Sequence, residues 1–575
     1  MEEIVRALGV GRRVLVGALF AGAFALVAGC AAELEDSADL VLRNGKVVTV
    51  DPAVPDGEAI AVQGDKILAV GSDAEIAQYI GSGTKVIDLE GQLAIPGFID
   101  AHGHFLGVGD AKMQLDLMNV ANWDEIVGMV EYAASDVAPG ALIRGRGWHQ
   151  EKWDEEPPGN VEGLPTHHTL SAVSPDNPVI LRHASGHASF ANAKAMEMAG
   201  ITNETPDPPG GEIVRDANGE PIGAFRERAQ GLLSAAAENA EPPDPRRQAE
   251  LAAEEALSKG VTSFHDAGVS FETVDLYKAM VDDGALGVRL WVMIRQPNDR
   301  LAELLPEYRM VDYGDHRLTV RAIKVSVDGA LGPHGAWLLE PYSDLPTSVG
   351  LNTSPIDDLH ETARIAMENN FQLCVHAIGD RANREVLDVF QAAFEANPAR
   401  ADLRWRIEHS QHLHPDDITR FGELGVIAAM QGIHCTSDGP WVVSRLGEQR
   451  AREGAYVWRD LWDTGAVIAN GTDAPVEDVD PIASYYATVT RVMKDGNAFF
   501  PEQRLTRMEA LETYTSLAAY AGFEEDVVGT LTPGKLADIT VLSQDILTIP
   551  DDEIPTTEVV YTIVGGKVMY QRGAE

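Results

Sequence analysis

The stretch "LAIPGFIDAHGHFLG", residues 93–107, is an apolar run that ends in two histidines separated by one glycine. In a strand, residues i and i+2 project from the same face about 7 Å apart, so His102 and His104 would stand side by side. That arrangement suits the binding of one ion. An isolated His-x-His pair belongs more often to an exposed turn, so the rest of the chain must decide between the two interpretations.

Seven further apolar segments, each followed by a helix-like stretch, lie between residue 260 and residue 475. They are "GVTSFHDAG", "GVRLWVMI", "VRAIKVSVDG", "FQLCVHAIGD", "RWRIEHS", "GVIAAMQ" and "GAVIANGTDAP". Repeated strand and helix units indicate a parallel sheet, and eight such units predict an α/β fold of the (β/α)8 TIM barrel type.

Short strands with tight turns occupy both ends of the chain. Asn44-Gly45 and Gly64-Asp65 are hairpin signals between apolar runs, and Gly565-Gly566 plays the same part near the C-terminus. We therefore predict a small β sandwich formed by residues 39–92 and 526–575.

The first two barrel strands are separated by roughly 155 residues, far more than a crossover helix needs. This spacing predicts an inserted α+β subdomain, residues 111–248, with a hairpin around "VRDANGEPIGAF". The barrel itself is then predicted to comprise residues 93–110 and 249–525.

The overall composition excludes several classes of protein. Hydrophobic residues make up 45% of the 575 residues and charged residues 23%, which is typical of a globular protein. The formal net charge of -44 argues against nucleic acid or anionic lipid headgroups as partners, because both would be repelled. The composition leaves the oligomeric state open, and a homo-oligomer is compatible with it.

The first 29 residues are interpreted as a lipoprotein signal peptide. Arg12 and Arg13 precede an apolar run too short for a comfortable membrane span, and Val27-Ala28-Gly29-Cys30 resembles a bacterial lipobox. The alternative is an ordinary signal peptide with an incidental cysteine. We expect an exported bacterial lipoprotein on the periplasmic or cell-surface side, attached to the membrane only through its N-terminal lipid. Cys374 and Cys435 are expected to be unpaired.

Polar residues fall where the predicted barrel strands end, which is where barrel enzymes place their chemistry. They are His102 and His104 on strand one, Lys324 on strand four, His376 on strand five, His409 on strand six and Asp473 on strand eight. Imidazole and carboxylate bind zinc and similar ions at about 2.0 to 2.2 Å. The set therefore predicts a divalent metal pair.

Lys324 does not fit a metal site as an ammonium. It shares a strand face with Ser326 and Asp328, and a desolvated lysine there would have a lowered pKa. Its neutral amine could react with carbon dioxide to give a carbamate that bridges two metals. The alternative is a lysine on the outer barrel surface, because lysine is almost never buried unpaired.

Several longer motifs resemble the amidohydrolase superfamily. "PGFIDAHGH", "VSVDGALGPHGAWLLEPY", "CVHAIGDRA", "RIEHSQ", "GTDAPVED" and "LTPGKLADITVLS" look like its amidohydrolase family 3 branch, which includes N-substituted formamide deformylases. The resemblance covers nearly all of residues 39–570. It implies a metal-dependent hydrolase of non-peptide amide bonds on a distorted barrel with a β sandwich, and it places the metal ligands at the six strand-end residues.

The resemblance also implies a mechanism for a small-molecule amide substrate. Two divalent ions, zinc first and manganese, cobalt or iron as alternatives, would polarise the carbonyl and generate a metal-activated hydroxide. Asp473 would take the proton of the water and pass it to the leaving nitrogen. A deaminase, a lactone or ester hydrolase, and an inactive surface-anchored binding protein are alternative interpretations.

Further residues are candidates for substrate binding. Trp148 and His187 resemble family positions in the insertion, where they would either hold substrate or pack structurally. His434 follows strand seven at the barrel mouth and is a candidate for binding the substrate or its oxyanion, and His334 and Arg381 are weaker candidates. His412, just beyond strand six, is expected to be exposed.

Overall fold

The computed structural model describes residues 37–238 and 244–574. The predicted signal peptide and Cys30 lie outside the described residues. Among the helices that the structure describes, none combines the length and the apolar character needed to cross a membrane.

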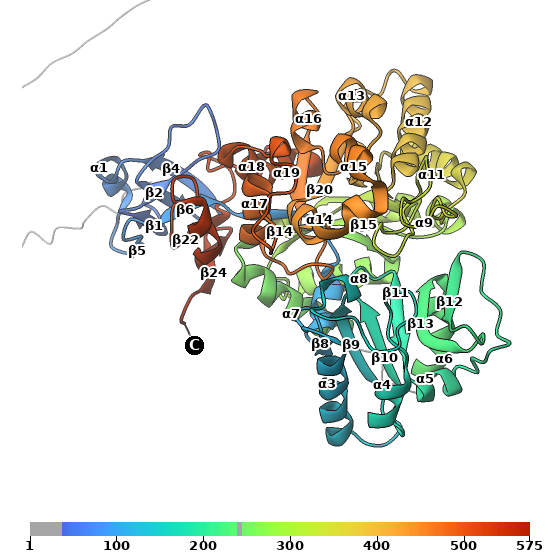
Figure 1. The fold of residues 1–575 in the computed structure, drawn as a ribbon. Coiled ribbons are helices and arrows are strands. Elements are labelled where there is room, and N and C mark those ends of the chain that lie inside the picture. Colours follow the sequence, from blue (N-terminus) through green and yellow to red (C-terminus); the bar gives the residue numbers. More distant parts are fainter. Residues whose placement is uncertain (1–36, 239–243, 575) are drawn as a thin grey trace, which may run out of the picture.

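Eight parallel strands form the predicted barrel (Figure 1). In sheet order they are β21 (Ile468–Gly471), β20 (Ile427–Gln431), β19 (Arg406–His409), β18 (Gln372–Ala377), β17 (Leu318–Ser326), β15 (Arg289–Ile294), β14 (Val261–Val269) and β7 (Phe98–Gly103). The barrel is nearly closed where the first and last strands meet. At the carboxyl ends of these two strands, the Asp473 amide donates to the His102 carbonyl and the His104 amide to the Ala474 carbonyl, both at 2.7 Å. The prediction of an eight-stranded barrel is confirmed.

Helices surround the strands, and in the longer ones the buried apolar residues recur at helical spacing. In α12 (Asp380–Ala396), for example, Ala382, Val386, Val389 and Phe390 are buried, so this face packs on the barrel. The other helices around the barrel are α2 (Phe105–Ala111), α7 (Pro245–Ser258), α8 (Phe271–Asp282), α9 (Asn298–Tyr308), α11 (Ile356–Asn369), α13 (Pro415–Leu424), α14 (Gly432–Leu446), α15 (Glu448–Gly454), α16 (Trp458–Asp463), α17 (Pro481–Thr490), α18 (Arg507–Thr513) and α19 (Ser516–Gly522).

The barrel interior is filled by side chains. Trp291 and Cys374 belong to one buried apolar cluster, and the indole of Trp291 donates to the Gly522 carbonyl at 3.0 Å. Arg406 is also fully buried there, where Ala101 and Glu408 accept its hydrogen bonds. Cys374 and Cys435 are both free and buried, as predicted.

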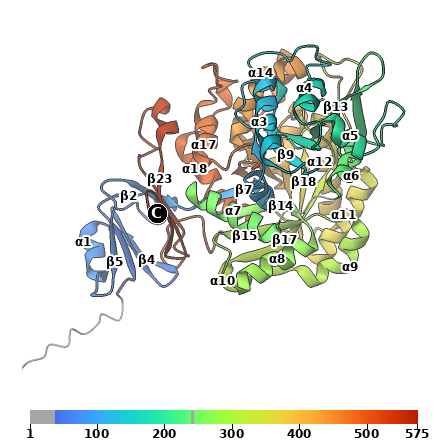
Figure 2. The same cartoon turned by 90° about the horizontal axis from the view of Figure 1, so that it is seen from below.

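Two sheets at one side of the barrel form the predicted sandwich, and Figures 1 and 2 show their blue and dark red strands side by side. The first sheet, in order, is β4 (Lys66–Gly71), β3 (Ala59–Gln63), β1 (Leu40–Arg43) and β5 (Lys85–Asp88). The second sheet is β2 (Lys46–Val47), β6 (Leu93–Pro96), β22 (Ile539–Leu542), β23 (Val559–Val564) and β24 (Lys567–Gln571). Both sheets contribute to one apolar cluster, so the two chain ends share a core.

The stretch from residue 93 to residue 107 is divided between two sheets. Its strand β6 belongs to the sandwich and only β7 belongs to the barrel, so the segment predicted as barrel begins with a sandwich strand. Gly97 separates the two strands, and a Cβ there would lie 2.2 Å from Oγ1 of Thr262. Only glycine allows this close approach.

The insertion after β7 contains a six-stranded sheet. Its order is β12 (Gly211–Arg215), β13 (Pro221–Glu227), β11 (Ala188–Ala191), β10 (Val179–His183), β9 (Ile143–Trp148) and β8 (Leu115–Asp116), with helices α3 (Trp123–Asp136), α4 (His168–Val173), α5 (Ala193–Met198) and α6 (Ser234–Ala237). The hairpin β12–β13 lies where the sequence predicted one. In Figure 2 the insertion lies in front of the barrel strands.

Candidate metal centre and active site

A cleft of about 1420 Å³ opens at the carboxyl ends of the barrel strands. Residues on β17, β18 and β19 and in the segments after β7, β15 and β21 line one part of it, and residues of the insertion sheet line another. The predicted site residues that line the cleft are His104, His187, Lys324, His376, His409, His434 and Asp473. The cleft is therefore shared between the barrel and the insertion.

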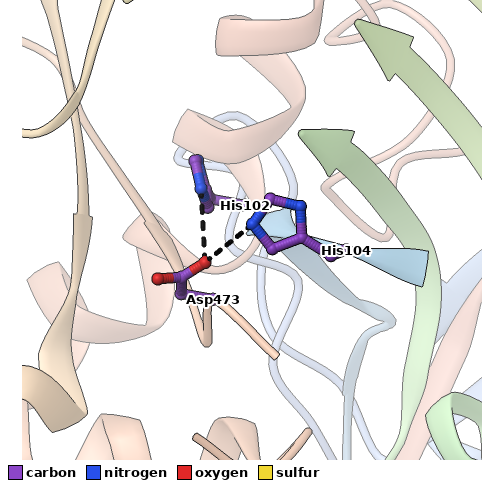
Figure 3. A group of neighbouring side chains, drawn as sticks. All are labelled: His102, His104 and Asp473. Atoms are coloured by element: carbon purple, nitrogen blue, oxygen red, sulfur yellow. Dashed lines mark ion pairs between the residues drawn. The ribbon is translucent and has the colours of Figure 1, made fainter. Parts of the chain in front are cut away.

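Three predicted ligands lie together at the closure of the barrel (Figure 3). Oδ1 of Asp473 is 3.5 Å from Nε2 of His102 and 3.3 Å from Nε2 of His104. The ligand atoms of these three residues all lie within 4.8 Å of one another. Burial lowers the pKa of His104 to about 4, so its ring is neutral near pH 7 and one of its nitrogens has a lone pair for an ion.

The other ring nitrogen of His102 is held by Glu408. Nδ1 of His102 bonds to Oε2 of Glu408, and Arg406 donates to Oε1 of the same carboxylate at 2.8 Å. Burial would raise the pKa of Glu408, but Arg406 and His102 together lower it below the usual range. A charged Glu408 accepts the Nδ1 proton, so Nε2 of His102 carries a lone pair directed at the site.

A second group is formed by His409, His434 and Asp473, whose ligand atoms also lie within 4.8 Å of one another. Nδ1 of His409 donates to Oε1 of Gln431 at 2.7 Å, so its Nε2 has a lone pair, as in His102. In His434 the arrangement is reversed. The amide of Gln411 donates to Nδ1 of His434 at 2.9 Å, so Nδ1 is the acceptor and the ring proton is on Nε2.

His376 lies between the barrel cluster and the insertion. Its ring centroid is 4.5 Å from that of His409 and 5.9 Å from that of His187. Nε2 of His376 is buried without a hydrogen bond and lies 3.4 Å from Oδ1 of Asp328. The backbone amides of residues 337, 378 and 379 donate to the Asp328 carboxylate, which fixes its position beside the ring.

Lys324 points into the cleft and not to the outer barrel surface. It is 3% exposed and lines the cavity. Burial lowers its pKa to about 8. Within the part of the chain that the structure describes, no carboxylate lies within 4.0 Å of its ammonium. The side chain therefore has the environment that favours a neutral amine.

Of the residues predicted to bind substrate, only His187 and His434 line the cleft. Trp148 is fully buried in the core of the insertion, and its indole donates to the Leu181 carbonyl at 2.9 Å. A bulge explains this position. Gly147 has φ 111, and the pairing of β9 with β10 shifts at this point, which turns Trp148 away from the cleft.

His334 and Arg381 do not line the cleft either. His334 bonds to Asp344 at 3.1 Å, and Arg381 pairs with Glu385 at 3.1 Å on the surface of α12. His412 is buried rather than exposed, because the loop after β19 packs below α12 and Asn383 donates to its carbonyl.

Sequence reasoning missed the residues that orient the histidines, namely Glu408, Gln431, Gln411 and Asp328. Glu408 stands beside His409 in "RIEHSQ", yet it bonds to a histidine on a strand that is not its neighbour. Period-two spacing marks Arg406 and Glu408 as one strand face, and a charged pair inside an apolar strand was the available signal.

Comparisons with known proteins agree with this fold. LONG AFTER FAR-RED 3 of Arabidopsis thaliana is 33% identical over 552 residues, covering 93% of this chain and 92% of the relative. An N-substituted formamide deformylase of Arthrobacter pascens is 29% identical over 546 residues, covering 93% and 98%. The crystal structure of an uncharacterized metal-dependent hydrolase from Pyrococcus furiosus is 28% identical and superimposes with a TM-score of 0.68, covering 88% of this chain and 100% of that chain.

A family model described as the amidohydrolase family matches residues 85–570. This match spans far more than half of the sequence, from the sandwich through the insertion to the last strands. The chain therefore belongs to the amidohydrolase family, in the family 3 branch that its motifs predicted.

Proposed function

We propose that this protein is a metal-dependent hydrolase that cleaves a non-peptide carbon–nitrogen bond, an amide, in a small molecule. The observation that carries the proposal is a set of buried polar atoms that lack hydrogen-bond partners. Nε2 of His102, Nε2 of His376 and Oδ1 of Asp473 are buried beside the cleft without hydrogen bonds in the described structure. Buried polar atoms are almost always bonded, so this convergence indicates a missing partner.

The residues present fit a divalent cation. His102 and His409 each donate from Nδ1 to a fixed oxygen, so Nε2 of each ring is unprotonated and offers a lone pair to an ion. His104 and His376 add two imidazoles, and Asp473 adds a carboxylate that both candidate groups share. Neutral imidazole with carboxylate suits zinc, and manganese, cobalt and iron accept the same ligands.

A pair of ions in this site would need a further anionic ligand, and a carbamate of Lys324 would supply it. The lowered pKa leaves a substantial fraction of neutral amine near pH 8. The amine nitrogen forms a bond to the carbon of carbon dioxide and loses one proton, so a neutral amine becomes an anionic carbamate. The buried position of Lys324 among the ligands supports this assignment.

With a divalent ion bound, the site gains a means to polarise the substrate carbonyl and to lower the pKa of water. The residues of the chain then divide the remaining work. Asp473 accepts a proton from the attacking water and delivers it to the leaving nitrogen, as the carbon–oxygen bond forms and the carbon–nitrogen bond breaks. Asp473 has a φ of 56, and its backbone amide donates a hydrogen bond to the His102 carbonyl. Together these two features hold the carboxylate at the barrel closure.

His434 is assigned to the carbonyl oxygen of the substrate. Its Nδ1 accepts from Gln411, so its Nε2 presents a proton, and this atom is buried at the cleft without an acceptor. A fixed donor of this kind stabilises the negative charge that develops on the oxygen in the transition state. His434 is therefore a hydrogen-bond donor in this proposal and not a metal ligand.

The choice of a carbon–nitrogen bond rests on similarity. The deformylase from Arthrobacter pascens matches nearly the whole chain. The proton that Asp473 takes from the water also favours an amide, because an amine leaving group must be protonated as the carbon–nitrogen bond breaks.

The test combines metal analysis with turnover. The protein is purified without chelator, its metal content is measured by elemental mass spectrometry, and hydrolysis is assayed on a panel of formamides, acetamides, esters and lactones. We expect near two ions per chain and faster turnover of amides than of esters. Tight ligand binding without turnover in metal-replete protein would overturn the proposal. Faster hydrolysis of esters than of amides would change the assigned reaction from amide hydrolysis to ester hydrolysis.

We also propose that the protein is exported and attached to the membrane by lipid on Cys30. The support is the Val27-Ala28-Gly29-Cys30 motif after an apolar run that follows two arginines. Incorporation of labelled palmitate in a bacterial host, and its loss in Cys30→Ser, tests this proposal. A labelled Cys30→Ser protein would overturn it.

A further inference from the structure

Two arginines of the insertion sheet stand next to each other at the cleft. Arg146 on β9 and Arg182 on β10 are direct partners in the parallel pairing of these strands. Register partners project from the same face of a sheet, and both side chains line the cleft. Arg144 and Arg228 of the insertion also line this cavity, which contains Asp473, but Arg146 and Arg182 are the pair that stand side by side on neighbouring strands.

Arg146 is fixed in place by backbone oxygens. It is 9% exposed, its Nε donates to the Pro475 carbonyl at 3.2 Å, and its Nη2 donates to the Ala184 carbonyl at 3.0 Å. Pro475 lies two residues after Asp473, so this contact ties the insertion to the catalytic loop. Carbonyl oxygens orient the guanidinium but do not neutralise its charge.

Arg182 has no polar partner within residues 37–238 and 244–574, and neither arginine there has a carboxylate within 4.0 Å. Both guanidinium groups face a common space beside Gly186. A methyl group placed on Gly186 would lie 3.6 Å from Nη2 of Arg182 and 4.0 Å from Nη1 of Arg146. Two like charges that face one space attract an anion into it, and Arg182 is exposed on this side, so a ligand in the cleft can reach it.

Four of the carboxylates that line the same cleft already have side-chain partners. Asp110 binds Arg144 at 3.0 Å, Glu227 binds His187 at 3.0 Å and Glu477 binds Lys152 at 3.2 Å. Asp438 accepts from the Tyr456 hydroxyl at 2.6 Å. With these four carboxylates engaged elsewhere, Arg146 and Arg182 stay without a carboxylate partner among the described residues, on the insertion wall of the cleft that also contains Asp473.

We propose that Arg146 and Arg182 bind a carboxylate of the substrate, so that the substrate class is a small amide carrying a carboxylate away from the scissile bond. This inference rests on the proposed function for the reaction, and it adds the recognition of the part of the substrate that does not react. Planar guanidinium groups match a planar carboxylate with paired hydrogen bonds, which gives both charge and direction.

The experiment compares substrates that differ only in charge. N-formylphenylalanine and N-formylphenylalaninamide are assayed as substrates, and 3-phenylpropanoate and 3-phenylpropanol are titrated by calorimetry onto the protein as purified. Arg182→Met is the first variant, because this side chain has no structural partner to lose. Arg226→Met is the matched control, since Arg226 is on the same sheet but is paired with Glu212 and Glu162.

We expect Arg182→Met to raise KM for the formyl acid and Kd for the propanoate about tenfold, and to leave the amide and the alcohol unchanged. Arg226→Met should change none of these values. Equal binding of propanoate and propanol by the native protein would overturn the inference, as would an unchanged Kd in Arg182→Met. Arg295, which follows β15 and lines the barrel side of the cleft, is the competing candidate. Loss of propanoate binding in Arg295→Met alone, or stronger competition by inorganic phosphate than by propanoate, would also overturn the inference.

The two proposals fail in different ways. Hydrolysis of neutral and anionic amides at equal rates, with no effect of Arg182→Met, removes the carboxylate site and leaves the amidohydrolase function. Propanoate binding that depends on Arg182, without turnover of any amide, removes the function and leaves the carboxylate site.

Discussion

Glu408 on β19 accepts a hydrogen bond from Nδ1 of His102 on β7, across the interior of the barrel. Two strands, β20 and β21, separate β19 from β7 in the sheet, so this contact spans the barrel rather than a pair of neighbours. It fixes which nitrogen of His102 faces Asp473. The geometry of the candidate metal site thus depends on a carboxylate that does not line the cleft.

Glu408→Gln tests that dependence. The substitution keeps the size of the side chain but removes the charge that holds the Nδ1 proton, so we expect metal affinity to fall about 10-fold to 100-fold. Chelator competition measures it, with thermal unfolding as a check on folding. Glu385→Gln, on the surface of α12, is the control. Unchanged affinity in a folded Glu408→Gln protein would show that the contact does not position His102.

His434→Ala should reduce kcat about a hundredfold while the metal content stays at the native value, because His434 is assigned to the carbonyl oxygen and not to the ions. His434→Gln retains a donor and should recover part of the rate. His360→Ala removes an exposed histidine of α11 and serves as the control. If His434→Ala lost metal in proportion to activity, the assignment of the Nε2 proton would be wrong.

Lys324→Ala should lower metal content and activity together, because it removes the proposed bridging anion. Bicarbonate should speed reconstitution of the native protein with zinc and should have no effect on the variant. Lys278→Ala, an exposed lysine of α8, is the control for both measurements. Full metal content and full activity in Lys324→Ala would exclude a bridged pair.

Glu524 should make the free energy of unfolding depend on pH. Burial raises its pKa from 4.5 to about 7, and its Oε2 has no hydrogen-bond partner within the described residues. An acid whose pKa is raised by folding stabilises the native state below its unfolded pKa, and this contribution is lost as the pH rises through the folded value.

Glu524→Gln should therefore match the native protein in Tm near about pH 4.5 and exceed it near about pH 8. Differential scanning calorimetry measures the Tm of both proteins at each pH. Subtracting the native Tm from the variant Tm cancels the contributions of the other titratable groups, which both proteins share. A constant Tm difference at the two pH values would contradict the prediction.

The barrel could be predicted because its information is local. Each strand is a short apolar run with a polar residue at its end, and the order of strands in a parallel barrel follows the order in the chain. The strand-end positions of Lys324 and Asp473 follow from this rule alone. The structure places both in the cleft.

Contacts across the barrel could not be predicted in the same way. Which residue faces His102 depends on strand tilt and register around the whole sheet, so Glu408 was not identified. Trp148 shows the effect of a smaller feature. One bulge at Gly147 reverses the face of the following residue, and a single sequence does not mark glycine as a bulge rather than a turn.

The backbone bonds that join His102 to Asp473 and His104 to Ala474 have a consequence for biosynthesis. The two sides of this junction are more than 360 residues apart in the chain, so a ribosome translates almost the entire barrel between them. A nascent chain that ends before Asp473 has the first two histidines but lacks their carboxylate. An ion that binds tightly only to the joined strands would therefore select finished molecules over truncated ones.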